Sequence, residues 1–294
     1  MTAVEYFEPA DLKQARDLLS RHPSAAIVAG GTDLVVGSRS GKRPLPKSLV
    51  AIHRVNELRG IEGQHRGGLR IGALTSHADV ESSSVVLRDW SALADASALV
   101  GSPATRHLGT IGGNVCNASP AMEVGAPLII FDARAELASR GGKRTVPFHE
   151  FVTGPGRTAA KAGELLTAVI LPALNRRPPV GSAYLRLEYR QAMEIAVVGA
   201  AAVVAVDRRG NCKRARIALT AVAPTCIRVR AAEEMIEGKR LGDGVIDEAA
   251  RTAAALARPI DDVRASADYR REMVAVIVAR AINRAVARAQ EAAR

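Results

Sequence analysis

Residues 110–120 read Thr110-Ile111-Gly112-Gly113-Asn114-Val115-Cys116-Asn117-Ala118-Ser119-Pro120, and this stretch is the most informative part of the chain. Its two adjacent glycines let the backbone approach a ligand closely and adopt a positive φ. The short polar side chains of Thr110, Asn114, Asn117 and Ser119 surround them. The composition predicts a loop, not the interior of a helix, that wraps a polar, phosphorylated ligand with N–H groups and hydroxyls. A plain glycine turn between two core segments is the alternative.

A second pair of glycines occurs earlier, where residues 27–34 read Ile27-Val28-Ala29-Gly30-Gly31-Thr32-Asp33-Leu34. A short apolar strand runs into the glycines and then into Thr32 and Asp33, residue types that favour the N-cap of a helix. Strand end, glycine turn and helix start together predict an anion site, because N–H groups and the positive end of the helix dipole point at the ligand. Two candidate phosphate loops on one chain are more than a single turn requires.

These two stretches resemble the flavin-binding signatures of a known family. Residues 29–34 and 110–114, followed by 117–120, are similar to the two signatures of the FAD-binding medium subunit of molybdenum hydroxylases. That group includes xanthine dehydrogenase-like, carbon monoxide dehydrogenase-like and N-heterocycle hydroxylase enzymes. The resemblance covers essentially the whole chain, in the family's order. The further matching segments are Gly101-Ser102-Pro103, Gly163-Glu164-Leu165-Leu166, Ile170-Leu171-Pro172 and Arg190-Gln191-Ala192-Met193-Glu194-Ile195-Ala196.

The resemblance implies an FAD site built from both loops. The first loop would hold the diphosphate through backbone N–H groups and the hydroxyl of Thr32, and the second would form the facing clamp. Ser119 and Glu123 would hold ribityl or ribose hydroxyls, Leu171 would pack near the flavin, and Arg186 would lie near its polar edge. The implied cofactor-binding residues are Val28, Ala29, Gly30, Gly31, Thr32, Asp33, Thr110, Gly113, Asn114, Asn117, Ser119, Glu123, Leu171 and Arg186.

The sequence departs from the family's pattern at two of these positions. Glu123 stands where an Asp is usual, and Arg186 replaces a common Lys, which keeps the charge but changes the geometry. Other roles therefore stay open. Glu123 could instead be an acidic residue in the first turn of a helix, where the helix dipole favours it. Arg186 could be a solvent-exposed strand residue, and Leu171 could be an ordinary core residue.

No catalytic or metal-binding set can be assembled from the sequence. The histidines are dispersed, and no spacing of histidine and carboxylate resembles a metal site. Cys116, Cys212 and Cys226 lie far apart without a CxxC, which excludes the usual zinc and iron–sulfur patterns and fits a reducing cytoplasm. We therefore expect no catalytic residues and no metal in this chain, and a bound cofactor that carries the chemistry.

The charge balance is strongly basic, with a net charge of +11 and a pI of about 10.2. The basic residues are scattered, and aromatic residues, at 3% of the chain, do not interleave with them as nucleic-acid binding on stacking platforms requires. A basic surface that faces acidic partner subunits is the preferred interpretation over a nucleic-acid or scaffold protein. No leader or apolar run of membrane-spanning length is recognised, so we expect a cytoplasmic protein without a membrane span.

The pattern of elements predicts an α+β fold: a two-part FAD-binding module, made of a small α/β unit and a mixed α+β domain, and a C-terminal three-stranded antiparallel sheet with helices. The expected domains are residues 1–56, 57–176 and 177–294. Short, largely apolar segments separated by turns predict strands at 27–29, 48–52, 69–73, 136–139, 145–148, 165–171, 183–190, 196–206 and 216–222. The expected helices are 11–21, 91–99, 120–131, 228–237, 247–257 and 266–292. The last helix is expected to pack its apolar face against the C-terminal sheet, and an interface helix is the alternative.

The resemblance also implies a function. The chain would be the FAD-carrying electron-transfer subunit of a molybdenum hydroxylase complex, with catalysis at a molybdenum cofactor in a large partner subunit. A small partner subunit with two [2Fe–2S] clusters would pass electrons to the FAD, in a dimer of heterotrimers, and an external acceptor would take them. The alternative is a stand-alone FAD-dependent oxidoreductase of the wider FAD-binding superfamily.

Overall fold

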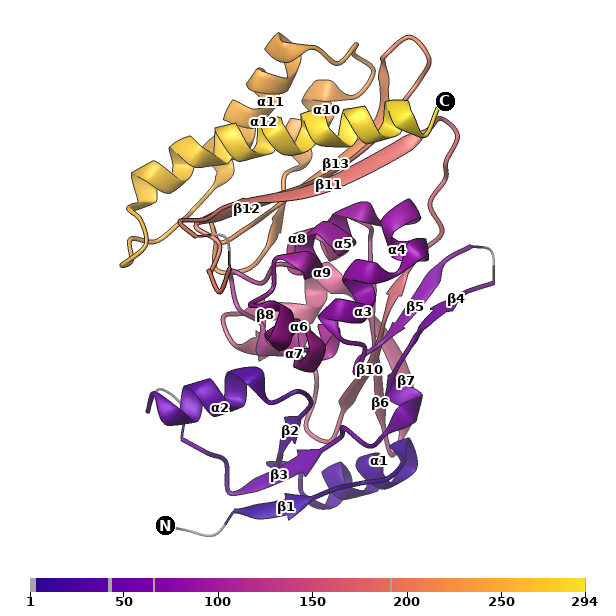
Figure 1. Cartoon of the computed structure of the whole chain (residues 1–294), viewed down its shortest axis with the longest axis vertical. Helices are drawn as coiled ribbons and strands as arrows, with labels where there is room; N and C mark the ends of the chain where they lie inside the picture. Colours follow the sequence, from indigo (N-terminus) through magenta and orange to yellow (C-terminus); the bar gives the residue numbers. More distant parts are fainter. Residues whose placement is uncertain (1–3, 42–43, 66, 191, 294) are drawn as a thin grey trace.

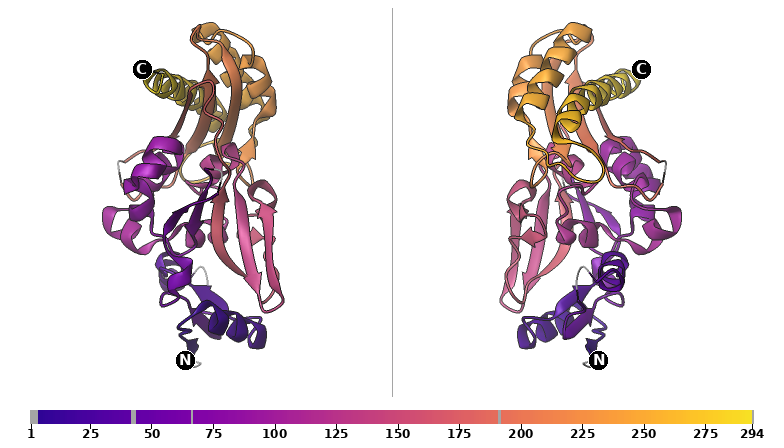
Figure 2. Two further views of the ribbon diagram at one scale, coloured as in Figure 1. Left: turned by 90° about the vertical axis from the view of Figure 1, so that its right-hand side faces the viewer. Right: turned by 90° about the vertical axis from the view of Figure 1, so that its left-hand side faces the viewer.

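The structure is a computed structural model that describes residues 4–41, 44–65, 67–190 and 192–293. Gln191 of the 190–196 segment therefore lies outside the described residues. Figure 1 shows three tiers along the long axis: a small N-terminal unit, a middle part, and a C-terminal sheet crossed by the last helix. Figure 2 shows the same tiers from the two sides. Each tier is built around its own sheet.

The N-terminal unit is a three-stranded parallel sheet in the order β1-β3-β2. The carboxylate of Asp11 accepts a hydrogen bond from the N–H of Gln14 and so caps the first helix. Ala15 and Leu19 of that helix pack against Val50 of the sheet. The elements are β1 (Glu5–Phe7), α1 (Leu12–Arg21), β2 (Ala26–Val28), α2 (Thr32–Arg39), β3 (Ser48–Ala51) and the 3-10 helix η1 (Asn56–Leu58).

The middle part is a five-stranded antiparallel sheet in the order β4-β5-β10-β6-β7, accompanied by short helices. Its central strand β10 is apolar and almost wholly buried. The strands are β4 (Ile61–Gly63), β5 (Leu69–Gly72), β6 (Arg134–Ser139), β7 (Gly142–Pro147), β8 (Val152–Gly154), β9 (Arg157–Thr158) and β10 (Leu165–Leu171). The helices are α3 (His77–Ser82), α4 (Ser84–Asp89), α5 (Ser91–Ala98), α6 (Pro103–Leu108), α7 (Ile111–Asn117), α8 (Gly125–Ile130) and α9 (Phe148–Phe151).

The C-terminal sheet has the antiparallel order β11-β12-β13-β14 and is covered on both faces. Strand β12 is buried at every residue, because alternate side chains point to opposite faces. Ala201 and Val203 join the core of the middle part, whereas Ala202 and Val204 join the core under the C-terminal helices. The elements are β11 (Val180–Leu187), β12 (Val198–Val206), β13 (Cys212–Thr220), β14 (Ile227–Arg228), α10 (Arg230–Ile236), α11 (Asp243–Leu256) and α12 (Ala267–Glu291).

The expected α+β fold is confirmed, with differences at several elements. Strand β10 has the predicted bounds, and the apolar face of α12 packs under the C-terminal sheet as expected. The helix expected at 120–131 is shorter and forms only at α8, and β7 ends before Phe148, which begins α9. A two-residue fourth strand, β14, extends the predicted three-stranded sheet. Each large sheet takes its strands from one of the expected segments, and the domain boundaries themselves stay predictions.

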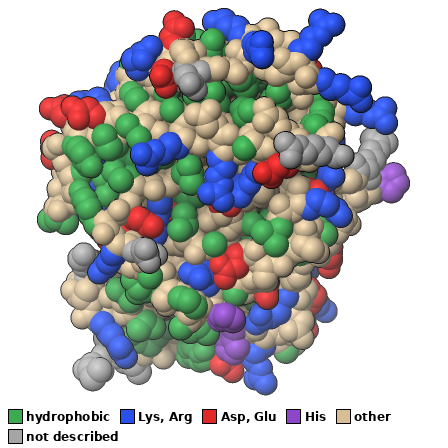
Figure 3. All heavy atoms as spheres, turned by 45° about the horizontal axis from the view of Figure 1, so that its top comes forward, with side chains coloured by type: hydrophobic (Ala, Val, Ile, Leu, Met, Phe, Trp, Pro, Cys, Tyr) green, Lys and Arg blue, Asp and Glu red, His purple; other side chains and the backbone are tan. Residues whose placement is uncertain are grey.

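The surface and the hydropathy of the helices add two observations. Figure 3 shows one face on which Lys and Arg side chains are spread out, with Asp and Glu side chains and apolar patches between them. Among the described residues, no helix is both long and apolar enough to cross a membrane.

Candidate functional site

The first glycine pair brings two parts of the chain into very close approach. Strand β2 ends at Val28, and Gly31 has a φ of 71°, which places it in the left-handed region that favours glycine. A Cβ at Gly30 would lie 1.8 Å from the carbonyl oxygen of Leu108 at the end of α6, so only a glycine fits there. The N-cap of α2 is Gly31 and has no side-chain cap. The sequence-based assignment of the cap to Thr32 or Asp33 was therefore wrong, although the predicted order of strand, turn and helix is confirmed.

The second glycine pair lies inside a helix, contrary to the loop expected from its composition. Thr110 is the N-cap of α7, and its Oγ1 accepts a hydrogen bond of 3.0 Å from the N–H of Gly113. A Cβ at Gly112 would lie 2.6 Å from the carbonyl oxygen of Ala73, so this glycine lets α7 pack directly on backbone. The cost of a glycine in a helix, about 1 kcal/mol, is offset by this packing and by the cap. Ala118, with a φ of 49°, ends the helix.

The two glycine pairs meet at one cavity of about 390 Å³ between the N-terminal unit and the middle part. Figure 1 shows α2 and β2 facing α6 and α7 across this region. The predicted site residues that line the cavity are Val28, Ala29, Gly30, Gly31, Thr32, Asp33, Thr110, Gly113, Asn114 and Asn117. Other lining residues include Ile52, Ala73, His77, Val100, Thr105, Gly109, Gly112, Cys116, Leu165 and Leu166. Residues distant in sequence thus form one concave, partly polar wall.

The lining fits a nucleotide cofactor such as FAD. The Oδ1 atom of Asn114 and the Nδ1 atom of His77 are buried without a hydrogen-bond partner among the described residues. Such atoms require a polar partner, which a bound ligand supplies. Both glycine pairs line the same cavity, and because glycines have no side chain, a phosphate could approach their backbone closely. The N-terminal end of helix α2, where the helix dipole favours an anion, also lines this cavity.

The remaining predicted residues, Ser119, Glu123, Leu171 and Arg186, do not line this cavity. Leu171 has 0% of its surface exposed and belongs to the core of the middle part, which agrees with its alternative role. The Oγ of Ser119 accepts a hydrogen bond of 3.2 Å from the N–H of Ala121 in the turn before α8. A contact of these residues with a cofactor stays a prediction.

Glu123 and Arg186 form a buried cluster of their own, where the middle part meets β11. Nη1 of Arg186 lies 2.5 Å from Oε1 of Glu123, and Nε of Arg186 donates to Oε2 of Glu188 at 2.6 Å. The hydroxyl of Tyr184 donates to the other oxygen of Glu123. Burial raises the pKa of Glu123 to about 7, and Arg186 and Tyr184 oppose that rise. Arg186 is therefore not a solvated strand residue, and the alternative that made it one was wrong.

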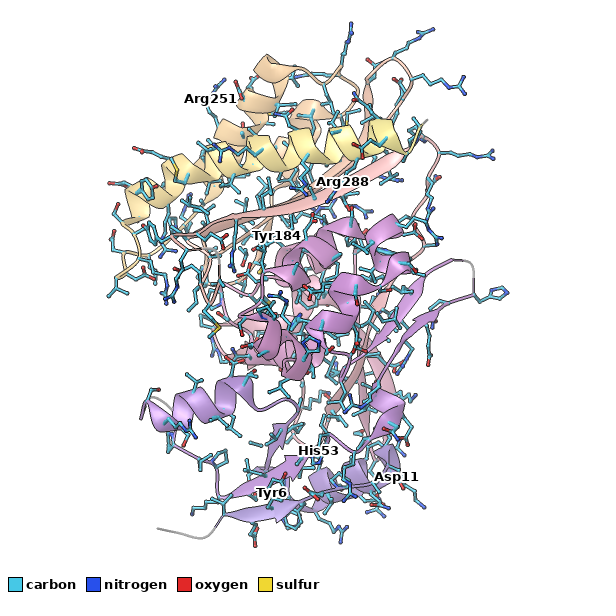
Figure 4. All side chains as sticks on the ribbon, viewed as in Figure 1. Tyr6, Asp11, His53, Tyr184, Arg251 and Arg288 are labelled. Carbon is cyan, nitrogen blue, oxygen red and sulfur yellow. The ribbon has the colours of Figure 1, made fainter. Side chains whose placement is uncertain are left out.

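Sequence reasoning missed Tyr184 and His77. Figure 4 shows Tyr184 where the C-terminal sheet meets the helices of the middle part. Its spacing from Arg186 was a usable signal, since residues two apart in a strand share a face. No local signal marked His77, because its place at the cavity depends on the contact between α3 and the segment around Gly109. Among the described residues, no group of three or more potential metal ligands comes together.

Two family models match the chain and together span most of it. The family described as the FAD binding domain in molybdopterin dehydrogenase matches residues 2–174. The family described as the CO dehydrogenase flavoprotein C-terminal domain matches residues 183–285. The first match contains every residue that lines the cavity.

Individual relatives agree over nearly their whole length. The xanthine dehydrogenase FAD-binding subunit of Escherichia coli is 33% identical over 97% of both chains. The carbon monoxide dehydrogenase medium chain of Hydrogenophaga pseudoflava is 34% identical over 97% of both chains. A solved structure of carbon monoxide dehydrogenase from H. pseudoflava contains a chain that matches with a TM-score of 0.91 at 34% identity, covering 97% of this chain and 98% of that one. A chain of quinoline 2-oxidoreductase from Pseudomonas putida matches with a TM-score of 0.90 at 30% identity, covering 99% of each.

Proposed function

Because this chain belongs to the family of FAD-binding medium subunits of molybdenum hydroxylases, we propose that it is the electron-transfer subunit of such an oxidoreductase complex. When bound, FAD supplies two-electron redox chemistry that links one-electron clusters to an external acceptor. The chain's own residues bind and orient the dinucleotide. The substrate is oxidised at a molybdenum cofactor in a large partner subunit, and two [2Fe–2S] clusters in a small partner subunit deliver the electrons.

The observation that carries this proposal is the meeting of both glycine pairs at one cavity. Each pair exposes backbone at a place where a side chain would collide with neighbouring backbone, at Gly30 and at Gly112. Residues 28–33 and Thr110 to Asn114 would hold the diphosphate from opposite sides, with Asn117 in the same wall. Ser119, Glu123, Leu171 and Arg186 would act farther along the cofactor or through the residues that touch it.

The partners are proposed from the names of relatives and from the chemistry that this chain lacks. Relatives named medium chains imply other chains in their enzymes. No nucleophile with a general base is apparent in the described residues that line the cavity, and a cofactor-holding subunit of this kind accepts electrons but does not activate a C–H bond. We propose a dimer of heterotrimers, and a cytoplasmic location because the three cysteines show no disulfide pairing.

Two measurements test the proposal. The purified complex should contain flavin, iron and molybdenum, with FAD in the present chain. The flavin-loaded chain alone, mixed anaerobically with the substrate of the complex, should keep its flavin oxidised, whereas the intact complex should bleach it. Bleaching by substrate in the isolated chain would instead favour a stand-alone flavin oxidoreductase. A chain purified without any flavin and unable to bind it would contradict both readings.

A further inference from the structure

We propose that His77 is a cofactor-positioning residue that contacts the anionic diphosphate of FAD, as the one side chain able to carry a positive charge among the described residues that line the cavity. The inference rests on the proposed function, since it presupposes that FAD binds in the cavity. It goes beyond that function by assigning a proton-dependent contact to a residue of α3, outside both glycine pairs.

The cavity wall has a marked shortage of cationic side chains. Among the described residues that line it, none is Lys or Arg, although the chain as a whole carries 41 of them. The lining side chains that can ionise are those of Asp33, His77 and Cys116. A diphosphate bound there would meet backbone N–H groups, hydroxyls and amides, and in the described part of the wall His77 is the side chain that could add a full positive charge.

His77 is held beside both halves of the site. Its N–H donates to the carbonyl oxygen of Gly109 at 3.0 Å, and the preceding residue, Ser76, forms a backbone bridge with Thr110, the cap of α7. A Cβ built on Gly109 would lie 3.5 Å from Cδ2 of the His77 ring and 3.9 Å from Oγ1 of Thr32. The imidazole therefore lies next to the junction of α6 and α7, on the side where the first turn of α2 approaches.

The imidazole has no partner of its own in the described structure. His77 has 1% of its surface exposed, yet it lines the cavity and its Nδ1 atom makes no hydrogen bond among the described residues. A buried polar atom of this kind costs stability unless it is paired. Helix α3 does not need the side chain, because Ser76 and Asp79 cap it reciprocally. A ligand in the cavity is the partner that the geometry leaves for it.

Burial, together with the charge of Arg106, keeps His77 neutral until an anion arrives. Burial first, and then the charge of Arg106, lower the pKa of His77 to about 4. Arg106 on α6 is itself paired with Glu81 at 2.9 Å. A bound diphosphate would place negative charge beside the ring and raise its pKa, so the complex should take up a proton. Helices α4, α5 and α6 pack against α3 and carry further ionisable groups: Arg88 and Asp89 on α4, which pair with each other, Asp95 on α5, which is paired with Arg288, and His107 on α6. Asp79 and Glu81 lie on α3 itself, and Asp33 on α2 and Cys116 on α7 line the same cavity.

The test is the pH dependence of FAD affinity in the full chain after its flavin has been removed. FAD is titrated between pH 5.5 and 8.5 by the change in flavin fluorescence. For the wild type, we expect affinity to fall as pH rises through the pKa of His77 in the complex. His77→Gln should bind FAD about tenfold to a hundredfold more weakly at the acidic end and lose this pH dependence. His107→Gln, at an exposed residue of α6 outside the cavity wall, is the matched control and should behave as the wild type.

The outcomes separate this inference from the proposed function. If the wild type binds no FAD, the proposed function fails. If it binds FAD and His77→Gln gives the same affinity and the same pH profile, the inference about His77 fails alone. Glu123→Gln, which removes a carboxyl group whose pKa is raised by burial to about 7, should leave the His77-dependent part of the profile in place. Loss of that part in Glu123→Gln would assign the proton to Glu123 and overturn the inference.

A second measurement keeps the proposal testable if His77→Gln does not fold. In a chain whose other histidines (His22, His53, His65, His107 and His149) are replaced by Gln, the imidazole C–H resonance reports His77 alone. At pH 6 this resonance should move from the neutral toward the protonated position when FAD is added. An unchanged ionisation state in the FAD complex would overturn the proposal.

Discussion

Nη1 of Arg186 on β11 lies 2.5 Å from Oε1 of Glu123, and the two side chains are 1% and 7% exposed. This ion pair joins the C-terminal sheet to the turn that leads into α8. It unites two of the residues that the resemblance to the family assigns to the cofactor. The carboxylate of Glu123 and the forked cation of Arg186 meet in a geometry that neither position suggests alone.

Replacing the cation should expose the cost of the buried acids around it. Arg186→Met leaves Glu123 and Glu188 next to each other without their common partner, and we expect a loss of about 3 kcal/mol at pH 8. Without Arg186 the pKa of Glu123 rises further above its unfolded value, so stability is retained below the unfolded pKa and is lost as pH rises through the folded pKa. The loss should therefore shrink toward pH 5. Urea unfolding at both pH values measures it, and Arg280→Met, at an exposed residue of α12, is the control; equal losses at both pH values would contradict the explanation.

Gly113 should be intolerant of a side chain for reasons of binding. Gly113→Val would project two methyl groups from the first turns of α7, in the cavity wall, with its Cβ 3.1 Å from Oγ1 of Thr110. We expect the variant to fold and to be purified with little or no flavin. Gly63→Val, at a strand position with open space around it, should keep its flavin. Full flavin content in Gly113→Val, measured by absorbance, would mean that α7 does not contact the cofactor.

Gly30 should not tolerate a side chain, because a side chain there would disturb packing as well as cofactor binding. Its Cβ would lie 1.8 Å from the carbonyl oxygen of Leu108, so Gly30→Ala must push the first loop away from α6. We expect both weaker FAD binding and a lower stability, by about 2 kcal/mol or more, in line with overpacking. Gly244→Ala in α11, where a Cβ meets nothing within 4 Å, should be neutral or slightly stabilising. Thermal unfolding of the flavin-free proteins measures the stability of both variants. If Gly30→Ala unfolded at the same temperature as the wild type, the first loop and α6 would separate easily.

The stability of the flavin-free chain should depend on the ionisation of His77. Its folded pKa of about 4 lies below the ordinary value of 6.5, so the unfolded chain binds the proton more tightly. The stabilisation is complete above pH 6.5 and is lost as pH falls toward 4. This loss amounts to about 3 kcal/mol. The difference between wild type and His77→Gln should change by that amount between pH 7 and 4, whereas His107→Gln should follow the wild type throughout.

Arg288 should fix the last helix to the middle part. It makes a two-point contact with Asp95 on α5, at 2.6 and 2.9 Å, and donates to the carbonyl oxygen of Ser182 on β11. Figure 4 shows Arg288 on α12 where it passes over β11. Arg288→Met should lower the free energy of unfolding by about 2 kcal/mol. The exposed Arg284→Met is the matched substitution on the same helix, and an equal effect of the two would mean that the contact with Asp95 contributes nothing.

Much of the fold, and the two glycine pairs that line the cavity, could be predicted from local sequence. Strand β10 was predicted with its observed bounds because its apolar run begins directly after Glu164 and ends at Pro172, which cannot donate to the ladder of a central strand. The first glycine pair was correctly placed between a strand and a helix, since the strand, turn and helix signals follow one another directly. The motifs of both glycine pairs were also sufficient to indicate the family.

The sequence by itself therefore determined the fold class through its hydrophobic periodicity. It indicated the family through the resemblance of its motifs, and it marked the two glycine pairs whose backbone lines the cavity. Tertiary structure decided the rest. Gly112 has to be a glycine within helix α7 because the backbone of Ala73, distant in sequence, lies where a side chain would be. Glu123 and Arg186 face each other, and His77 reaches the cavity, only because separate elements are brought together. No local sequence pattern encodes such contacts, because the two partners lie far apart along the chain and meet only when the chain has folded.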